Sequence, residues 1–326
     1  MADTVNLLGE WEATSVKVGD VLAALDQLRR SSQRTATRAS VVNLVAVVPD
    51  RATGEHACDT MDALGARHPG RTVVLVLDAQ DDGGMDASVK LHAGAVDGIR
   101  LWSEDIILTV RGATRRHLSS VVEPLLLPDL PCALWFVATR PSPDDLLIDT
   151  ADVILVDSKE LGAVDCFPDL LQLARRRTVT DLCWLRLTPW RVLLAGMFEG
   201  RAYRPFLRGV RAVEVRGKPG PRDLLAGWLT ARLRLPRSAL HVADARHAWL
   251  RLSAQVDGTT AEFVTERHGE ERVIRATARV EGGPSHEELL PLPDTSLPWS
   301  LARALSDLEG DWVYEEALAA ALDLAA

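Results

Sequence analysis

The stretch Val41-Val42-Asn43-Leu44-Val45-Ala46-Val47-Val48 decides the fold class. Asn43 alone interrupts an apolar run without alternation, which is typical of a strand whose two faces are both covered. Similar apolar runs follow at 72–77, 133–137 and 153–157. Helical patterns lie between or after these runs, at 53–67, 113–126, 143–149 and 168–177. This alternation predicts a doubly wound α/β fold with a mainly parallel sheet, Rossmann-like or flavodoxin-like.

Two further segments predict antiparallel additions to that sheet. Residues 88–93 and 106–110 alternate apolar and polar side chains, as half-exposed strands do. They are too close together for the crossover helix that parallel strands need, so we expect a hairpin. Before the first buried strand, apolar residues at helical spacing predict a helical lead-in over 19–30.

The pattern changes after Arg175-Arg176-Arg177-Thr178, which predicts a domain boundary there. Beyond it we expect one or two helices over 181–198, broken near Pro189, a strand at 210–215 and a helix from Pro221 to about residue 235. Three alternating runs joined by turns predict an antiparallel meander, at 247–256, 260–267 and 273–280. Two helices, at 298–308 and 312–324, complete the pattern. The sequence therefore predicts an N-terminal α/β domain over 1–178 and a C-terminal α+β domain with an antiparallel sheet over 179–326.

Charge and composition narrow the classes of function. The chain has 326 residues and a net charge of −9, which argues against general affinity for nucleic acid or an anionic membrane. The N-terminus has no signal-peptide pattern, and no apolar run approaches the length of a membrane helix. The cysteines show no C-x-x-C spacing, so we expect reduced, buried thiols and a cytoplasmic protein. They are Cys58, Cys132, Cys166 and Cys183.

The chain lacks the common catalytic and ligand motifs. No G-x-G-x-x-G follows the first buried strand, and no G-x-S-x-G is present. The stretch Arg216-Gly217-Lys218-Pro219-Gly220-Pro221 lacks phosphate-loop spacing, and its prolines have no N–H for a phosphate. His286-Glu287-Glu288 is followed by Leu290 where a zinc motif needs a second histidine. We therefore expect no catalytic, cofactor-binding or metal-binding residues, and a protein that acts by binding a partner.

Positive charge is concentrated in one segment, over 201–237. Only Glu214 and Asp223 offset ten basic residues there, so the segment carries +8. Such a field suits a phosphorylated ligand, an acidic protein surface or RNA. The alternative is that these side chains are scattered and paired locally with acids. The ten are Arg201, Arg204, Arg208, Arg211, Arg216, Lys218, Arg222, Arg232, Arg234 and Arg237.

A second notable segment combines tryptophan with arginine. Trp184, Arg186, Trp190 and Arg191 lie within eight residues, in a chain with nine tryptophans and two tyrosines. Tryptophan and arginine are enriched in interface hot spots, although a helix of this kind also suits a protein core.

Four segments carry a resemblance to a known family. They are Asp181-Leu182-Cys183-Trp184-Leu185-Arg186-Leu187-Thr188-Pro189-Trp190-Arg191, the run 125–131 leading into Leu134-Trp135, the run 149–152 leading into a strand that ends Asp157-Ser158, and 38–47. In their order along the chain, these segments resemble the glucose-6-phosphate dehydrogenase assembly protein family, OpcA, over about 38–235. The resemblance implies a non-catalytic bacterial protein that binds glucose-6-phosphate dehydrogenase and promotes its active oligomer. It also implies allosteric activation, and so a role in the oxidative pentose phosphate pathway and in NADPH supply.

One departure from the family concerns redox control. Members under thiol control tend to carry cysteines near the hairpin strands and after the His-Pro pair. The corresponding stretches here, 68–71, 91–93 and 101–104, contain none. We therefore expect no thioredoxin-type switch.

These observations lead to one interface hypothesis and two alternatives. The second domain would present the Trp/Arg motif and part of the basic segment to the dehydrogenase, through Trp184, Arg186, Trp190, Arg191, Arg201, Arg204 and Arg208. The first alternative is an enzyme or sensor of sugar phosphates. The second is an RNA-binding module that uses the +8 segment.

Overall fold

The computed structural model describes residues 6–32, 41–64, 70–79, 83–96, 99–268 and 272–325. Arg38, His68 and Pro69 lie outside these residues. The chain divides into two compact units, each formed from several segments. Unit 1 comprises Met1–Asp157, Arg175–Thr180 and Leu297–Glu309, and unit 2 comprises Ser158–Ala174, Asp181–Ser296 and Gly310–Ala326. The domain boundary predicted at Thr178 stays a prediction.

A mostly parallel sheet forms the centre of unit 1, as the sequence predicts. The described residues give eight strands in the order β1-β4-β5-β3-β2-β6-β7-β8. Strand β2 (Val42–Val48) pairs in parallel with β3 (Gly70–Leu77) on one side and β6 (Cys132–Phe136) on the other. Strand β7 (Val153–Val156) pairs in parallel with β6, and β8 (Thr178–Asp181) follows. The order β3-β2-β6-β7-β8 is that of a flavodoxin-like sheet, and every residue of β2 is buried.

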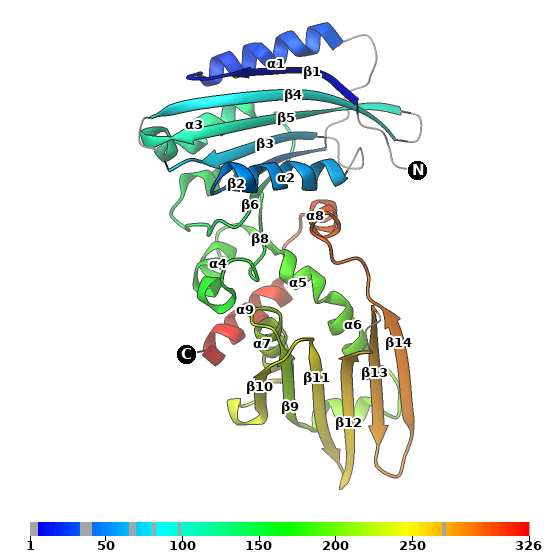
Figure 1. Cartoon of the computed structure of the whole chain (residues 1–326). Helices are drawn as coiled ribbons and strands as arrows, with labels where there is room; N and C mark the ends of the chain where they lie inside the picture. Colours follow the sequence, from blue (N-terminus) through cyan, green and yellow to red (C-terminus); the bar gives the residue numbers. More distant parts are fainter. Residues whose placement is uncertain are drawn as a thin grey trace. The chain divides into compact units, whose positions relative to one another are not determined.

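The antiparallel additions form a long hairpin at one side of this sheet. Strands β4 (Gly84–Val96) and β5 (Ile99–Arg111) each span 13 residues, well beyond the short alternating runs that predicted them. Strand β5 pairs in parallel with β3, and β1 (Asn6–Ala13) pairs antiparallel with β4 at the sheet edge (Figure 1). The sequence did not predict β1, because most of its side chains are exposed and it has no apolar face.

Helices cover both faces of the unit 1 sheet. Helix α1 (Val18–Ser32) contacts β1 and β4, and α2 (Arg51–Leu64) contacts β2 and β3 (Figure 1). Gly54 permits the close approach of α2, because a Cβ there would lie 3.2 Å from Val76. Helix α8 (Leu297–Ser306) contacts α2. Within the described residues no helix is long and apolar enough to cross a membrane.

The prediction of one helix over 113–126 is wrong. The structure has a 3-10 turn at Gly112–Arg116, a short helix α3 (Leu118–Val122) and a second 3-10 turn at Glu123–Leu125. Pro124 has no backbone N–H, so it cannot continue the α-helical hydrogen bonds. A further 3-10 turn, Leu146–Thr150, replaces the acidic helix predicted at 143–149, and the Asp145 carboxylate caps its start.

Unit 2 contains the predicted antiparallel meander. In the described residues its sheet has the order β10-β9-β11-β12-β13-β14 (Figure 1). Strands β11 (Trp249–Val256), β12 (Thr259–Arg267) and β13 (Val273–Val280) pair antiparallel, and β9 (Val210–Gly217) pairs with β11. Asp257 and Gly258 both have positive φ, as a tight hairpin turn requires. The sequence missed the two edge strands, β10 (Leu240–Asp244) and β14 (Ser285–Pro291), and only Leu290 in β14 is even partly buried.

The helices of unit 2 include a closely packed pair. Helix α7 (Pro221–Leu233) contacts α9 (Trp312–Ala325), and α4 (Phe167–Ala174) also contacts α9. Gly227 makes the α7/α9 approach possible, because a Cβ there would lie 2.1 Å from the Ala317 carbonyl oxygen. The helix predicted over 168–177 ends at Ala174 and gives way to β8. The predicted break near Pro189 is present, between α5 (Leu182–Arg186) and α6 (Thr188–Gly196).

Candidate partner interface

The Trp/Arg motif begins with a buried helix cap at Asp181, which is 1% exposed. One oxygen of its carboxylate accepts hydrogen bonds from the backbone N–H groups of Cys183, at 2.9 Å, and Ser158, at 3.1 Å. The other accepts a hydrogen bond from the Tyr314 hydroxyl at 3.3 Å. Burial raises the pKa of Tyr314 well above its usual value. Tyr314 therefore stays a neutral donor that links α9 to the start of α5.

A second carboxylate receives the motif's tryptophan. The Trp184 indole N–H donates to Asp311 at 2.7 Å, and the other Asp311 oxygen accepts from the N–H groups of Val313 and Tyr314 at the start of α9. The rings of Trp184 and Tyr314 lie 5.8 Å apart. The motif thus fixes α5 against α9 inside unit 2.

Arg191 completes this network from α6. Its guanidinium carbon lies 3.5 Å from the centroid of the Trp184 ring, and its NH2 group donates to the Thr188 hydroxyl at 3.1 Å. Burial lowers the pKa of Arg191 to about 10, against an opposing effect of Asp311. Arg191 is therefore still a cation at neutral pH, held over an aromatic face.

The structure separates the predicted interface residues into three groups by their exposure. Trp184 is 2% exposed and Trp190 is 6% exposed, so both rings belong to the interior of unit 2. Arg186 and Arg191 are partly exposed at the same helix pair. The exposed members are Arg201, Arg204 and Arg208, in the segment after α6.

This segment, residues 200–209, is called the arginine loop below. Two of its aromatic side chains, Tyr203 and Phe206, pack with the preceding Phe198 around Phe263 of β12. The ring centroids of Phe198, Tyr203 and Phe206 lie 4.2, 6.1 and 6.4 Å from that of Phe263. A 3-10 turn over Arg204–Gly209 gives the loop a regular backbone. Among the described residues, no carboxylate forms an ion pair with its three exposed arginines. The aromatic contacts thus hold the backbone of the loop in place, and its exposed arginines present positive charge that no described carboxylate compensates.

Three of the seven other basic residues in the segment form ion pairs with carboxylates among the described residues. Arg216 pairs with Glu214, Arg222 with Asp223 and Asp244, and Arg232 with Glu316. Arg237 donates to the Leu324 carbonyl at 2.7 Å. Local ion pairs therefore offset part of the +8 charge. The three exposed arginines of the arginine loop form no such pair among the described residues.

A hollow on unit 2 adds two arginines that sequence reasoning missed. It has a volume of about 500 Å³ and is lined by Arg211, Arg251 and Arg279 together with Glu262 and Glu281. Arg251 and Arg279 come from β11 and β13, which the meander brings to either side of β12. Their separation in sequence hides this arrangement.

All four cysteines are free thiols. Cys132, Cys166 and Cys183 are buried, whereas Cys58 on α2 is partly exposed. Burial is the main cause that raises the pKa of Cys58 and of Cys132 to about 12. Neither of these two is poised as a thiolate at neutral pH.

Fold and surface together define a protein of two units. One has a flavodoxin-like sheet, and the other has a mostly antiparallel sheet that supports an arginine-rich loop. Two family models match the chain, and both describe a glucose-6-phosphate dehydrogenase subunit. The model of its N-terminal domain matches residues 61–175, and the model of its C-terminal domain matches residues 177–318. The chain belongs to this family, OpcA. A search of curated proteins found no match.

Proposed function

We propose that this protein is a non-catalytic, cytoplasmic assembly factor that binds glucose-6-phosphate dehydrogenase, promotes its active oligomer and activates it allosterically. The observation that carries the proposal is the match of two models named for a subunit of that dehydrogenase, together over most of the chain. The consequence would be a greater flux into the oxidative pentose phosphate pathway and a greater supply of NADPH.

The arginine loop supports a specific contact within this proposal. Arg201, Arg204 and Arg208 are exposed and have no acidic partner among the described residues, so an acidic surface could pair with them at little structural cost. Arg186, the motif residue at the end of α5, is partly exposed. Trp184, Trp190 and Arg191 would contribute by fixing α5 and α6 in place, because the two indoles are buried.

The experiment combines activity with complex mass. Glucose-6-phosphate dehydrogenase from the same genome is assayed with and without this protein, while light scattering follows the mass of the complex. We expect a saturable rise in activity together with co-migration of the two chains. If neither activity nor mass changes at micromolar concentrations, the proposal is wrong.

A charge-reversal pair then tests the surface. The triple variant Arg201→Glu, Arg204→Glu, Arg208→Glu should weaken binding by at least tenfold. The control carries the same change of charge on unit 1, through Arg116→Glu, Arg175→Glu and Arg303→Glu, which are also exposed. If both triple variants bind the dehydrogenase equally well, the arginine loop is not part of the interface. The assembly function itself is tested separately by the mass of the complex.

The hollow near Arg211 favours a second candidate function, the binding of a sugar phosphate. Three arginines around about 500 Å³ suit a small phosphorylated ligand, although Glu262 and Glu281 partly offset their charge. Saturable thermal stabilisation by glucose 6-phosphate, lost in Arg251→Ala, would support it. A steep loss of RNA binding with salt would instead favour the RNA-binding alternative.

A further inference from the structure

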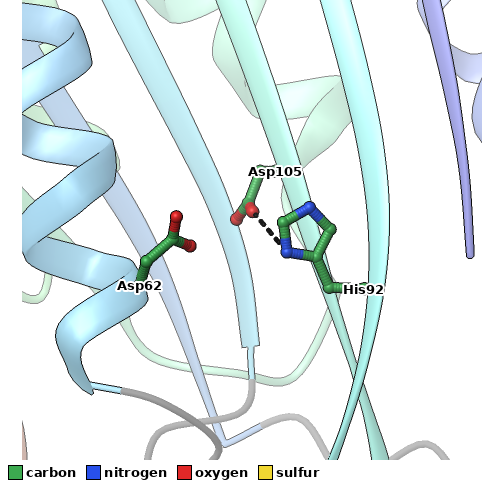
Figure 2. A group of neighbouring side chains, drawn as sticks. All are labelled: Asp62, His92 and Asp105. Carbon is green, nitrogen blue, oxygen red and sulfur yellow. Dashed lines mark ion pairs between the residues drawn. The ribbon is translucent and has the colours of Figure 1, made fainter. Parts of the chain in front are cut away.

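Three titratable side chains from different elements of unit 1 come together beside the β4/β5 hairpin. Asp62 lies in the last turn of α2, His92 on β4 and Asp105 on β5 (Figure 2). One ligand atom of each lies within 4.8 Å of the other two. Figure 2 shows both carboxylates directed into the space between the helix and the strands. No sequence motif reveals this group, because its members are widely separated along the chain.

The distance between His92 and Asp105 suits two ligands of one metal ion. Nδ1 of His92 lies 3.7 Å from Oδ2 of Asp105, which is too long for a hydrogen bond. Two donors about 2.1 Å from a tetrahedral ion would be about 3.4 Å apart. Nε2 of the same ring is buried without a hydrogen-bond partner among the described residues. The Nδ1 atom of His92 also accepts no hydrogen bond among the described residues. Its lone pair is therefore available to a metal.

Asp105 is a half-buried carboxylate, with a side chain 20% exposed, and its negative charge is incompletely compensated. Burial is the main cause that raises its pKa to about 6, while His92, Lys90 and a hydrogen bond with Thr72 act in the opposite direction. Asp62 also raises it, since two carboxylates repel when both are ionised. A divalent cation between them would relieve both the burial cost and the repulsion.

Cys58 lies one turn before Asp62 on α2. Burial, followed by the negative charges of Asp105 and Asp62, raises the pKa of its thiol to about 12. A divalent cation at the carboxylates would reverse this electrostatic effect and favour the thiolate.

We propose that Asp62, His92 and Asp105 form a binding site for one divalent metal ion such as zinc. The imidazole nitrogen and two carboxylate oxygens are ligands that zinc accepts, and imidazole disfavours magnesium and calcium. Water completes the coordination. The ion would join the C-terminal turn of α2 to both strands of the hairpin. The metal site does not depend on the binding partner proposed above.

Zinc binding to the full-length protein tests the site. After removal of metal with a chelator, zinc is titrated by calorimetry, and cobalt is titrated with its visible spectrum as the readout. We expect one equivalent of either metal and a cobalt spectrum of tetrahedral type.

Variants then assign the ligands. Asp62→Asn, His92→Gln and Asp105→Asn should each weaken zinc binding by at least tenfold. The control Glu55→Gln removes another exposed carboxylate of α2, 69% exposed, and should leave binding unchanged. Lys90→Met should strengthen binding, because it removes a competing cation near Asp105.

Two outcomes would overturn the proposal. One is no binding at about 100 μM zinc, a concentration far above what structural zinc sites need. The other is binding that is unaffected by all three ligand variants. Asp62 is exposed, so Asp62→Asn decides the question even where Asp105→Asn fails to fold.

Discussion

The guanidinium of Arg191 stacks on the indole ring of Trp184, 3.5 Å from its centroid, while the indole N–H donates to Asp311. A cation, an aromatic ring and a carboxylate thus form one connected group inside unit 2. Asp311 also caps α9, so the group connects three helices. The Trp/Arg motif therefore has a structural role, because it packs these three helices together.

Replacement of Trp184 should destabilise unit 2. Trp184→Phe keeps an aromatic ring but leaves an Asp311 oxygen without its donor, which costs about 1–3 kcal/mol. The midpoint of urea unfolding measures the change. Trp312→Phe is the control, because Trp312 is 59% exposed and should cost far less. Equal effects of the two substitutions would contradict a structural role for the Trp184 network.

A single methyl group should disturb the α7/α9 pair. In Gly227→Ala the new Cβ would lie 2.1 Å from the Ala317 carbonyl oxygen, so the helices must move apart. We expect a loss of about 1–3 kcal/mol in the free energy of unfolding. Gly196→Ala in α6 is the control, because its Cβ meets nothing within 4 Å and alanine favours a helix. A Gly227→Ala protein as stable as the control would show that the contact is looser than described.

Glu104 should make unit 1 sensitive to acid. It accepts hydrogen bonds from Arg29 at 2.6 Å and from Arg71 at 2.8 Å, and it is 4% exposed. Burial alone would raise its pKa, but Arg29 and Arg71 together lower it below the usual 4.5. Because the folded pKa is depressed, the stabilisation is present above pH 4.5 and is lost as the pH falls through the folded value.

The variant Glu104→Gln separates this contribution from general acid denaturation. It leaves two arginines near an uncharged amide and should cost about 3–5 kcal/mol at pH 7. Melting temperature is measured between pH 7 and pH 3 for both proteins. The difference between them should shrink as the pH falls, and a constant difference would exclude ionised Glu104 as the cause.

Binding of the dehydrogenase should weaken as salt rises, if the arginine loop carries the contact. Exposed charges are screened over about 8 Å at physiological ionic strength, so the association rate should fall most. Binding kinetics at several salt concentrations measure this. The Arg201, Arg204 and Arg208 triple variant should show a shallower dependence, whereas an identical slope would place the charge contact elsewhere.

Zinc affinity should fall below about pH 6, where Asp105 takes up a proton. Proton and metal compete for the same carboxylate, so affinity should drop about tenfold per pH unit in that range. Zinc titrations between pH 7.5 and pH 5 measure it, with Glu55→Gln as the matched protein. A flat profile would remove Asp105 from the ligand set.

The strand around Asn43 shows how far local pattern reaches. A continuous apolar run can be buried only between two layers, so residues 42–48 predict both their strand and the helices that cover it. The alternating runs on either side of Asp257-Gly258 likewise predict the meander, because period and turn chemistry agree. Elements without such a pattern were missed, namely β1, β8, β10 and β14.

The sequence by itself determined the α/β class, the meander and the family resemblance, since periodicity, turn residues and motif order are local properties. Only the tertiary structure decided that Trp184 and Trp190 are buried and that the arginine loop is exposed and, among the described residues, uncompensated. It alone brought Asp62, His92 and Asp105 together. The physical reason is that burial, pairing and proximity depend on which distant elements pack against one another, and no single segment encodes that.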